Sequence, residues 1–296
     1  MDQGRILRAT GLRPRKRLGQ NFLVDPSVPP RIAAAAALDP AALVVEVGPG
    51  LGVLTAELAG RLDPAQGCLV AIELDEALLP PLRTHMAPYP HFHLIAGDVL
   101  ATDPAALVAH CGRAAAAPYA VVANLPYYIT SAVLRHFLTA AHPPQRLVVM
   151  VQHEVALRMT AVPPAMSLLA LGVQFYGRPQ LMFRVPPGAF LPPPKVDSAV
   201  VRIDVYAPAD RPVQADAAQF FAVARAGFGQ RRKQLANALA DGLPLPKPLV
   251  LAALAAAAIV GSRRAETLTL LEWAALAVAL PPDLGPRSGK ATFDDA

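Results

Sequence analysis

The segment Asn124 to Tyr127 carries the most specific arrangement of chemically useful groups in this sequence. An amine on an aromatic ring is a poor nucleophile because its lone pair is delocalised into the ring. Two acceptors for its N–H groups, the side-chain oxygen of Asn124 and the backbone carbonyl of Leu125, would favour sp³ geometry and free that lone pair. Pro126 stiffens the turn by fixing φ, and the Tyr127 ring offers a face on which a base can stack. The pattern predicts methyl transfer to an exocyclic amine of a nucleobase.

A second aromatic residue, Phe190, is a candidate for the other wall of the same base pocket. From spacing alone, a position in the hydrophobic core is an equally good interpretation of this phenylalanine. The Asn124 segment also has an ordinary interpretation, as a strand end followed by an Asn turn and a Pro stop. We prefer the chemical interpretation because the segment comes after three signals for a nucleotide-type site.

The first of these signals is a glycine-rich turn, in which residues 48–52 read Gly-Pro-Gly-Leu-Gly. Gly48 and Gly50 let the backbone turn tightly and approach a ligand without a Cβ in the way. Glu46 stands two residues before the first glycine, where its carboxylate can pair with the cationic amino group of a methionine moiety. These residues predict one end of a cofactor site.

The other two signals are acids at the ends of the next two predicted strands. Glu73 lies where a carboxylate can accept from both hydroxyls of a ribose, and Asp98, followed by Val99, where it can accept from an adenine amino group. In open α/β sheets, ligands collect beyond the carboxyl ends of strands. A ligand that contains adenosine explains both acids and the glycine turn.

Two adenosine cofactors fit this pattern, S-adenosylmethionine and NAD. A glycine-rich turn with an acid about 20 residues further on is also typical of NAD sites. The spacing here is G-x-G-x-G and not G-x-G-x-x-G, Glu46 precedes it, and no second dinucleotide half follows. These details favour S-adenosylmethionine, with an NAD-dependent enzyme as the alternative.

Alternating elements in the first two thirds of the chain would position these residues. Apolar runs that predict strands alternate with segments of helical spacing, which is typical of a parallel sheet with helices on both faces. The predicted strands are 43–47, 69–73, 93–96, 120–123 and 146–151, with edge strands at 180–185 and 198–205. The predicted helices between them are 51–62, 76–85, 104–110 and 131–140. We therefore expect a doubly wound, Rossmann-like α/β sheet.

The last third of the chain lacks strand signals and predicts a small all-helical C-terminal domain. Its expected helices are 220–240, 248–259 and 267–280. We expect a domain over 1–206 that includes a basic N-terminal arm, a helical domain over 207–283, and a disordered tail over 284–296.

The net charge of +5 favours a polyanionic partner. Positive charge is concentrated in two clusters, and the alternative for each is a solvated face. The first contains Arg5, Arg8, Arg13, Arg15, Lys16 and Arg17, and the second contains Arg231, Arg232 and Lys233. Together with a nucleotide-type site, we interpret Arg15, Lys16, Arg17 and the second cluster as RNA-binding.

Other classes of protein fit the composition poorly. No apolar stretch has the length of a membrane span, and the basic N-terminus lacks the apolar core of a signal peptide. The two cysteines, Cys68 and Cys111, are too few for a disulfide framework and have no metal-ligand spacing. We expect no metal, no membrane contact, a reducing cytoplasm and a monomer.

Taken in order, these motifs resemble the rRNA adenine N6,N6-dimethyltransferases. Arg17 to Leu23 is similar to the family's opening motif, and the cofactor and Asn124–Tyr127 motifs follow in the family's order. The remaining matches are Gln152–Ala156, Phe190–Ser198 and Phe228–Leu235. The resemblance covers about 15–280, and it implies a class I methyltransferase fold that uses S-adenosylmethionine.

The resemblance also implies roles for single residues. It implies cofactor contacts at Asn21, Leu23, Gly48, Glu73, Asp98 and Asn124, and base-pocket roles for Asn124, Leu125, Tyr127 and Phe190. One departure is the segment 160–169, where the family usually has a polar loop and a Tyr-Gly-x-Leu-Ser turn. This loop is shorter and more apolar here.

Two branches of this family are alternative assignments for the chain. The housekeeping branch (KsgA/RsmA-type) modifies two adjacent adenines near the 3′ end of 16S rRNA during ribosome biogenesis. The Erm-type branch modifies one adenine of 23S rRNA and confers antibiotic resistance. Leu125 after Asn124 resembles the first branch, since the second typically has Ile there. A ribosome assembly factor with secondary catalysis is a further alternative.

Overall fold

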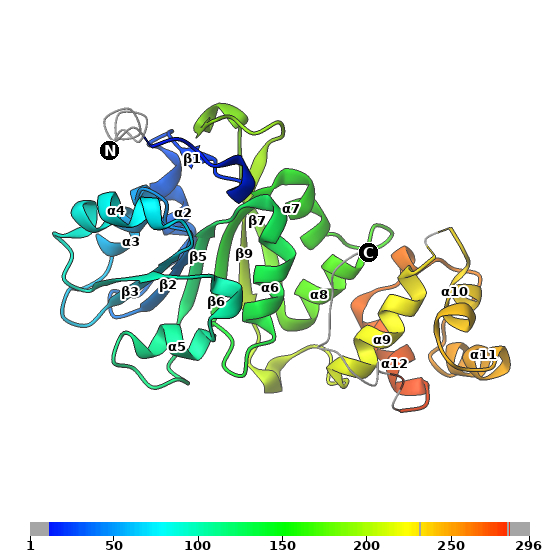
Figure 1. The fold of residues 1–296 in the computed structure, drawn as a ribbon. Helices are drawn as coiled ribbons and strands as arrows, with labels where there is room; N and C mark the ends of the chain where they lie inside the picture. Colours follow the sequence, from blue (N-terminus) through cyan, green and yellow to red (C-terminus); the bar gives the residue numbers. More distant parts are fainter. Residues whose placement is uncertain (1–11, 231, 283, 285–296) are drawn as a thin grey trace. The chain divides into compact units, whose positions relative to one another are not determined.

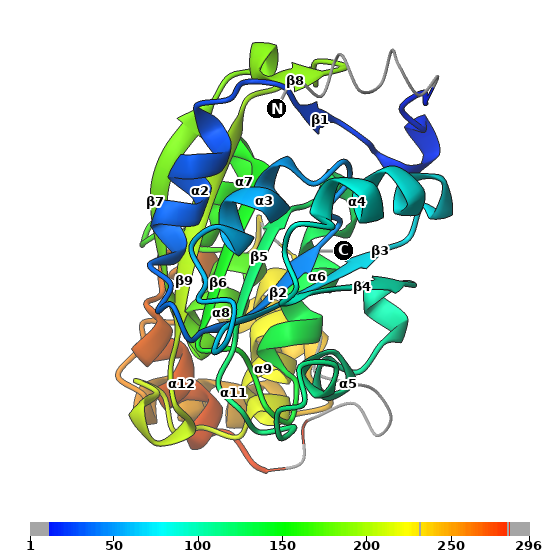
Figure 2. The same cartoon turned by 90° about the vertical axis from the view of Figure 1, so that its left-hand side faces the viewer.

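A seven-stranded sheet brings the predicted site residues to one edge. In a computed structural model, which describes residues 12–230, 232–282 and 284, the strand order is β4-β3-β2-β5-β6-β9-β7 (Figures 1 and 2). The strands are β2 (Leu43–Val47), β3 (Cys68–Glu73), β4 (Phe92–Ala96), β5 (Ala120–Asn124), β6 (Arg146–Gln152), β7 (Gly177–Val185) and β9 (Ser198–Val205). Each predicted strand is present, but β9, which was expected at an edge, lies between β6 and β7. The strand order reverses between β2 and β5, where such sheets bind ligands.

Pairing in this sheet is mostly parallel. β2 pairs in parallel with β3 and β5, β3 with β4, and β5 with β6, whereas β9 runs antiparallel to β6. Every residue of β2 and β3 is buried, which explains their uninterrupted apolar sequences. The carboxyl ends of β2, β3 and β5 therefore meet at one edge of the sheet.

Helices between the strands supply the surrounding core. They are α2 (Val28–Ala36), α3 (Val53–Ala59), α4 (Leu79–Met86), α5 (Pro104–Ala109), α6 (Thr130–Leu138) and α7 (His153–Met159). Ile32 of α2, Leu58 of α3 and Leu82 of α4 are fully buried in one cluster with side chains of the central strands. This cluster fixes the helices that follow the glycine turn and β3.

A short two-stranded sheet holds the N-terminal segment. β1 (Phe22–Leu23) runs antiparallel to β8 (Phe190–Leu191), with Leu23 opposite Phe190, and the two lie side by side in Figure 2. The Val24 N–H continues the contact by donating to the Ala189 carbonyl at 2.8 Å. The segment before α2 is thereby attached to a part of the chain that follows β7.

The chain divides into two compact units. The first comprises the described part of 1–156 together with 179–205, and the second comprises 157–178 and the described part of 206–296. The second contains α8 (Leu168–Tyr176), α9 (Ala217–Phe228), α10 (Leu235–Gly242), α11 (Lys247–Ala256) and α12 (Leu270–Ala279). Residues 157–178 fall in this unit, unlike in the expected division, because α8 packs on α9: the Phe175 and Phe220 ring centroids are 4.8 Å apart.

The single helix expected over 220–240 is wrong. α9 ends at Phe228, and α10 begins only at Leu235, after Gln234 in extended conformation. The intervening run from Gln230 to Gln234 contains no apolar residue to pack against a neighbour. Of the predicted basic cluster, Arg231 lies outside the described residues, as do Arg5, Arg8 and positions 285–296 of the expected tail.

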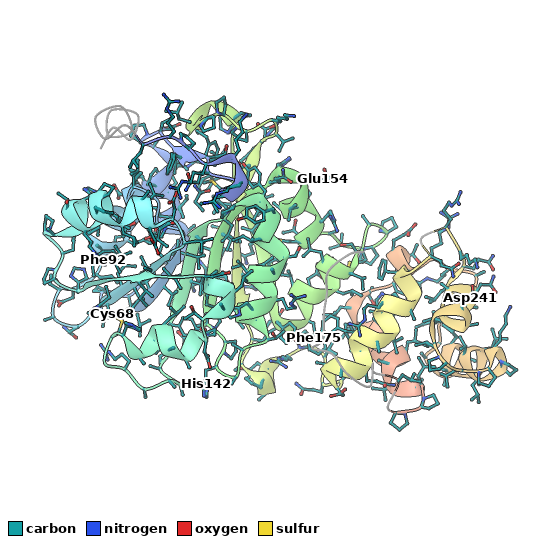
Figure 3. The ribbon with its side chains drawn as sticks, viewed as in Figure 1. Cys68, Phe92, His142, Glu154, Phe175 and Asp241 are labelled. Carbon is teal, nitrogen blue, oxygen red and sulfur yellow. A yellow bond between two sulfur atoms is a disulfide. The ribbon has the colours of Figure 1, made fainter. Side chains whose placement is uncertain are left out.

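The two cysteines form a disulfide, which corrects the expectation drawn from their number. Cys68, labelled in Figure 3, lies at the start of β3, and Cys111 lies just after α5, with Cα atoms 6.0 Å apart. The bond joins residues 43 apart in sequence, a proximity that only the folded sheet creates. Separately, none of the helices among the described residues has the length and apolar character needed to span a bilayer.

Candidate active site

One pocket collects the predicted cofactor and target residues. It lies at the carboxyl ends of β2, β3 and β5 and is bordered by the N-terminal residues 18–23. The predicted residues that line it are Asn21, Leu23, Glu46, Gly48, Gly50, Glu73, Asp98, Val99, Asn124, Leu125, Pro126 and Tyr127. Phe190 and the basic residues are not among its lining residues.

The glycine turn after β2 depends on backbone that favours glycine. Gly48, Gly50 and Gly52 have φ values of +67°, +60° and +87°, in the left-handed region where a side chain is strained. A Cβ at Gly52 would also lie 2.7 Å from Leu82 Cδ1. The Gly48 N–H donates to the Ile72 carbonyl at 3.0 Å, which fixes the turn against β3.

Glu46 is the most deeply buried acid of the pocket. Its residue is 1% exposed, and Oε2 has no hydrogen-bond partner among the described residues. Burial raises the pKa of Glu46 to about 8, because the charged form is poorly solvated there. A buried carboxyl among the residues that line the pocket suits a cationic ligand group, which would restore its ionised form.

Glu73 stabilises the glycine turn by hydrogen bonding, and the same residue lines the pocket. Its Oε2 accepts the Gly50 N–H at 3.1 Å, and its Oε1 accepts the Asp75 N–H at 2.8 Å. Burial raises the pKa of this carboxyl, and these two backbone donors oppose that rise. A carboxylate oxygen accepts more than one hydrogen bond, so Glu73 can also receive ligand hydroxyls.

Asp98 and Val99 follow β4, which ends at Ala96. Asp98 is exposed, and its Oδ1 accepts the Leu100 N–H at 2.9 Å, which caps the short 3₁₀ helix Val99–Ala101. This cap orients the carboxylate at the pocket wall. Val99 is buried beside it and adds an apolar surface on which a flat ring can rest.

The target segment begins on the last residue of β5. Asn124 Nδ2 donates to the Asn21 carbonyl at 3.5 Å, so its side-chain oxygen keeps its capacity to accept. The Leu125 N–H donates to the Met150 carbonyl of β6 at 3.2 Å, and its side chain is buried. The sheet thus anchors both groups that were predicted to accept from an amine.

Tyr127 has a partner that the sequence did not indicate. Its hydroxyl forms a 2.7 Å hydrogen bond with the Ser198 hydroxyl, and Ser198, the first residue of β9, is 0% exposed. Burial raises the pKa of Tyr127, so the phenol stays neutral, and the Ser198 hydrogen bond opposes that rise. The contact joins residues 71 apart and fixes the direction of the ring.

Phe190 occupies the core in this structure. It is 3% exposed, pairs with Leu23 across β1 and β8, and packs in the cluster that contains Val28 and Ile32. The alternative interpretation from the sequence, a core phenylalanine, describes this position. A role as the second wall of the base pocket would require the ring to leave that cluster.

The basic residues differ in how strongly they are engaged. Arg15 forms a 2.7 Å ion pair with the buried Asp75, whereas Lys16 and Arg17 are exposed on a short 3₁₀ helix, Lys16–Leu18. In the helical unit, Lys233 pairs with Asp241 at 2.6 Å, and Arg232 is exposed. Exposed ion pairs of this kind are weak because water competes for both charges. Lys233 therefore remains available to bind a phosphate.

No three His, Cys, Asp or Glu side chains of the described residues are grouped so as to hold a metal ion. The pocket itself presents buried carboxyls, hydrogen-bond acceptors at a strand end, and an aromatic face.

Comparison with known proteins gives consistent results. The family model described as "Ribosomal RNA adenine dimethylase" matches residues 11–276. A protein of Dehalococcoides mccartyi named "Ribosomal RNA small subunit methyltransferase A" is 51% identical over 262 residues, which are 88% of this chain and 87% of that protein. A protein of Moorella thermoacetica with the same name is 44% identical over 282 residues, which are 93% of this chain and 95% of that protein.

Two solved structures share the architecture. A crystal structure of the 23S rRNA methyltransferase ErmE superposes with a TM-score of 0.69 at 28% identity, covering 88% of this chain and 99% of that one. A dimethyladenosine transferase from Plasmodium falciparum gives a TM-score of 0.71 at 22% identity, covering 86% and 95%, and this likeness concerns the fold. Both agree with a Rossmann-like sheet and a helical C-terminal region.

Proposed function

The chain belongs to the ribosomal RNA adenine dimethylase family and is an rRNA methyltransferase, and from this premise we propose that it dimethylates N6 of two adjacent adenines near the 3′ end of 16S rRNA. The relatives named for the small ribosomal subunit match nearly the whole chain at 44–51% identity, which supports this substrate. The immature small subunit is the proposed partner.

A single observation carries the chemistry: Asn124, Leu125 and Tyr127 stand together at the end of β5 in the pocket that holds the acids. Asn124 Oδ1 and the Leu125 carbonyl would accept the two N–H groups of the adenine amine and concentrate its lone pair on nitrogen. Tyr127, held by Ser198, would stack on the extruded base, a contact worth ~1–3 kcal/mol. Positioning then supplies most of the acceleration.

The pocket residues fit S-adenosylmethionine as the methyl donor. The buried carboxyl of Glu46 suits its cationic amino group, and Glu73 and Asp98 suit its ribose and adenine. Gly48 and Gly50 leave room for a close approach, and Asn21 and Leu23 border the same pocket. When bound, this cofactor supplies an electrophilic methyl group on its sulfonium.

The remaining parts of the proposal concern RNA contact, location and assembly. Lys16, Arg17, Arg232 and Lys233 are proposed phosphate contacts, with Arg231 outside the described residues. A ribosomal substrate supports a cytoplasmic location, although disulfides such as Cys68–Cys111 are uncommon there. We propose that the protein acts as a monomer.

A second candidate function is methylation of 23S rRNA. The fold similarity to the 23S rRNA methyltransferase ErmE, at 28% identity, favours it. The higher identity to small-subunit methyltransferases favours the first proposal.

Transfer of labelled methyl from S-adenosylmethionine separates these candidates. The protein is incubated with immature small-subunit particles or with free 23S rRNA, and product nucleosides are identified. We expect N6,N6-dimethyladenosine from the particles alone. Label in 23S rRNA would favour the second candidate, and label in neither substrate would contradict both.

A further inference from the structure

Asp75 is a buried carboxylate directly after β3 that the proposed chemistry does not use. The residue is 2% exposed and stands at the start of the 3₁₀ helix Glu76–Leu78, where its Oδ1 accepts the Ala77 N–H at 3.2 Å. Burying a charge is costly unless strong partners replace water. A backbone cap alone would leave most of that cost uncompensated.

The compensating partners come from the N-terminal segment. Arg15 Nη1 lies 2.7 Å from Asp75 Oδ1, and Gln20 Nε2 donates to Asp75 Oδ2 at 2.8 Å. The Arg15 backbone N–H donates in turn to Gln20 Oε1 at 2.8 Å, so the two partners also hold each other. We call these three side chains the Asp75 latch, which joins segments 55 residues apart.

The latch lies next to the part of the N-terminal segment that borders the cofactor pocket. Residues 18–23 line that pocket, and the chain is attached at two points. On one side is the latch, and on the other is the pairing of β1 with β8. The Arg15 side chain is 42% exposed, so water can compete for it, and the latch can open while the paired strands stay in place.

The same aspartate is also connected to the acid proposed to bind the cofactor ribose. The Asp75 N–H donates to Glu73 Oε1, while Glu73 Oε2 accepts the Gly50 N–H. Opening the latch therefore acts next to Glu73, at the border of the pocket. Dimethylation of two adenines consumes several methyl donors, one at a time, so the pocket must repeatedly release one product and admit the next donor.

We propose that Asp75 is a positioning residue that holds segment 15–23 against the cofactor pocket, and that opening of the Asp75 latch sets the rate of cofactor exchange between methyl transfers. This inference rests on the proposed function, since it takes the pocket to bind S-adenosylmethionine. It assigns no contact with the reacting atoms to Asp75.

The test measures dissociation of S-adenosylhomocysteine from the full-length protein by chase of the labelled ligand. Asp75→Asn removes the charge that holds Arg15, and we expect dissociation about tenfold faster, equivalent to ~1.4 kcal/mol. Arg15→Gln should give a similar acceleration, and the double variant little more than either alone, because both break one interaction. Asp39→Asn, which loses the same charge at the amino end of β2, is the control and should leave the rate unchanged.

A second measurement tests, in the ligand-free protein, whether the Asp75 latch is open. Trypsin cleavage after Lys16 and Arg17 should be faster in Asp75→Asn than in the wild type or in Asp39→Asn, at equal thermal stability. Unchanged cleavage and unchanged dissociation in Asp75→Asn would overturn the latch while leaving the proposed function intact. Failure of the wild type to bind S-adenosylhomocysteine would overturn the proposed function and the exchange role together.

Discussion

Two acids beside the pocket of the sheet unit and two acids of the helical unit have pKa values shifted in opposite directions. In the sheet unit, Glu46 and Glu73 are buried beside a pocket, and burial raises the pKa of each, to about 8 for Glu46. In the helical unit, Glu272 receives Arg263 and the Thr269 N–H, and these donors lower its pKa to about 2. Asp241 is similar, since Lys233 lowers its pKa.

Under the proposed function, this difference separates acids that bind the cofactor from acids that stabilise the fold. Glu272 completes a capping box with Thr269 at the start of α12, so its charge is satisfied within the chain. Glu46 has a buried oxygen with no partner among the described residues, which is unfavourable in the ligand-free protein. Four substitutions test this contrast, from the largest expected effect to the smallest.

Asn124→Ala should separate activity from stability most strongly. Loss of one of two acceptors for the amine should lower kcat for methyl transfer by about 10²–10³-fold, as for loss of a transition-state hydrogen bond elsewhere. Binding of S-adenosylmethionine should stay measurable, because one neutral hydrogen bond contributes about 1 kcal/mol. Single-turnover assays measure the rate of methyl transfer, and calorimetry measures the affinity for S-adenosylmethionine. Asn237→Ala, at an exposed contact with Lys247 in the helical unit, is the control, and near-normal turnover by Asn124→Ala would contradict the role assigned to this residue.

Glu46→Gln should change how the stability of the ligand-free protein depends on pH. The folded pKa of about 8 exceeds the ordinary glutamate pKa of 4.5, so the folded state keeps a proton that the unfolded state loses. Stability should therefore fall as pH rises from about 4.5 through 8, by on the order of a few kcal/mol from Glu46. Denaturant unfolding at several pH values should show a flatter profile in Glu46→Gln, with Glu57→Gln as a control for charge loss. If the free energy of unfolding depends on pH in the same way for wild type, Glu46→Gln and Glu57→Gln, the raised pKa of Glu46 is contradicted.

Ser198→Ala tests whether the Tyr127 ring is held by its hydroxyl. The variant leaves a half-buried phenol without its partner, and we expect kcat/KM to fall about three- to tenfold, since such a loss costs ~1 kcal/mol or slightly more. Tyr127→Phe keeps the ring, and the double variant should recover part of the loss because both polar partners are gone. Strictly additive losses would show that the two hydroxyls act independently.

Glu272→Gln should have the smallest effect and the opposite dependence on pH. The pKa lowered to about 2 means that this acid stabilises the fold above about pH 4.5, and that the contribution is lost as pH falls toward 2. The side chain is partly exposed, so we expect only ~1 kcal/mol at neutral pH. Unfolding free energies of wild type and variant should converge on acidification. A constant difference down to pH 3 would contradict the assignment.

The sequence was sufficient to predict the sheet and most of the pocket, because both follow from local patterns. Strands buried on both faces must be apolar throughout, as in β2 and β3. Parallel connections then place the residues after β2, β3 and β5 at one edge, so Gly48, Glu73 and Asn124 meet without any contact being known in advance.

Such local patterns could not predict contacts between segments that are distant in the sequence. Nothing local to Ser198 or Asp75 indicates that one meets Tyr127 and the other Arg15, since each depends on how the completed fold places two loops. Phe190 fits a pocket wall or a core equally well until β1 pairs with β8. The break between α9 and α10 was missed because the apolar residues on either side keep a helical spacing.

The central claim is that the buried carboxyl of Glu46 is kept for the cationic end of the methyl donor, and calorimetry tests it most directly. S-adenosylmethionine is titrated into wild type and Glu46→Gln at pH 7 in two buffers that differ in ionisation enthalpy. A carboxyl with a pKa of about 8 is mostly protonated at that pH and must ionise to pair with a cation, so the wild type should release on the order of one proton per ligand bound. Glu46→Gln should bind more weakly and release almost none. Equal proton release by both proteins, or none by the wild type, would contradict the account.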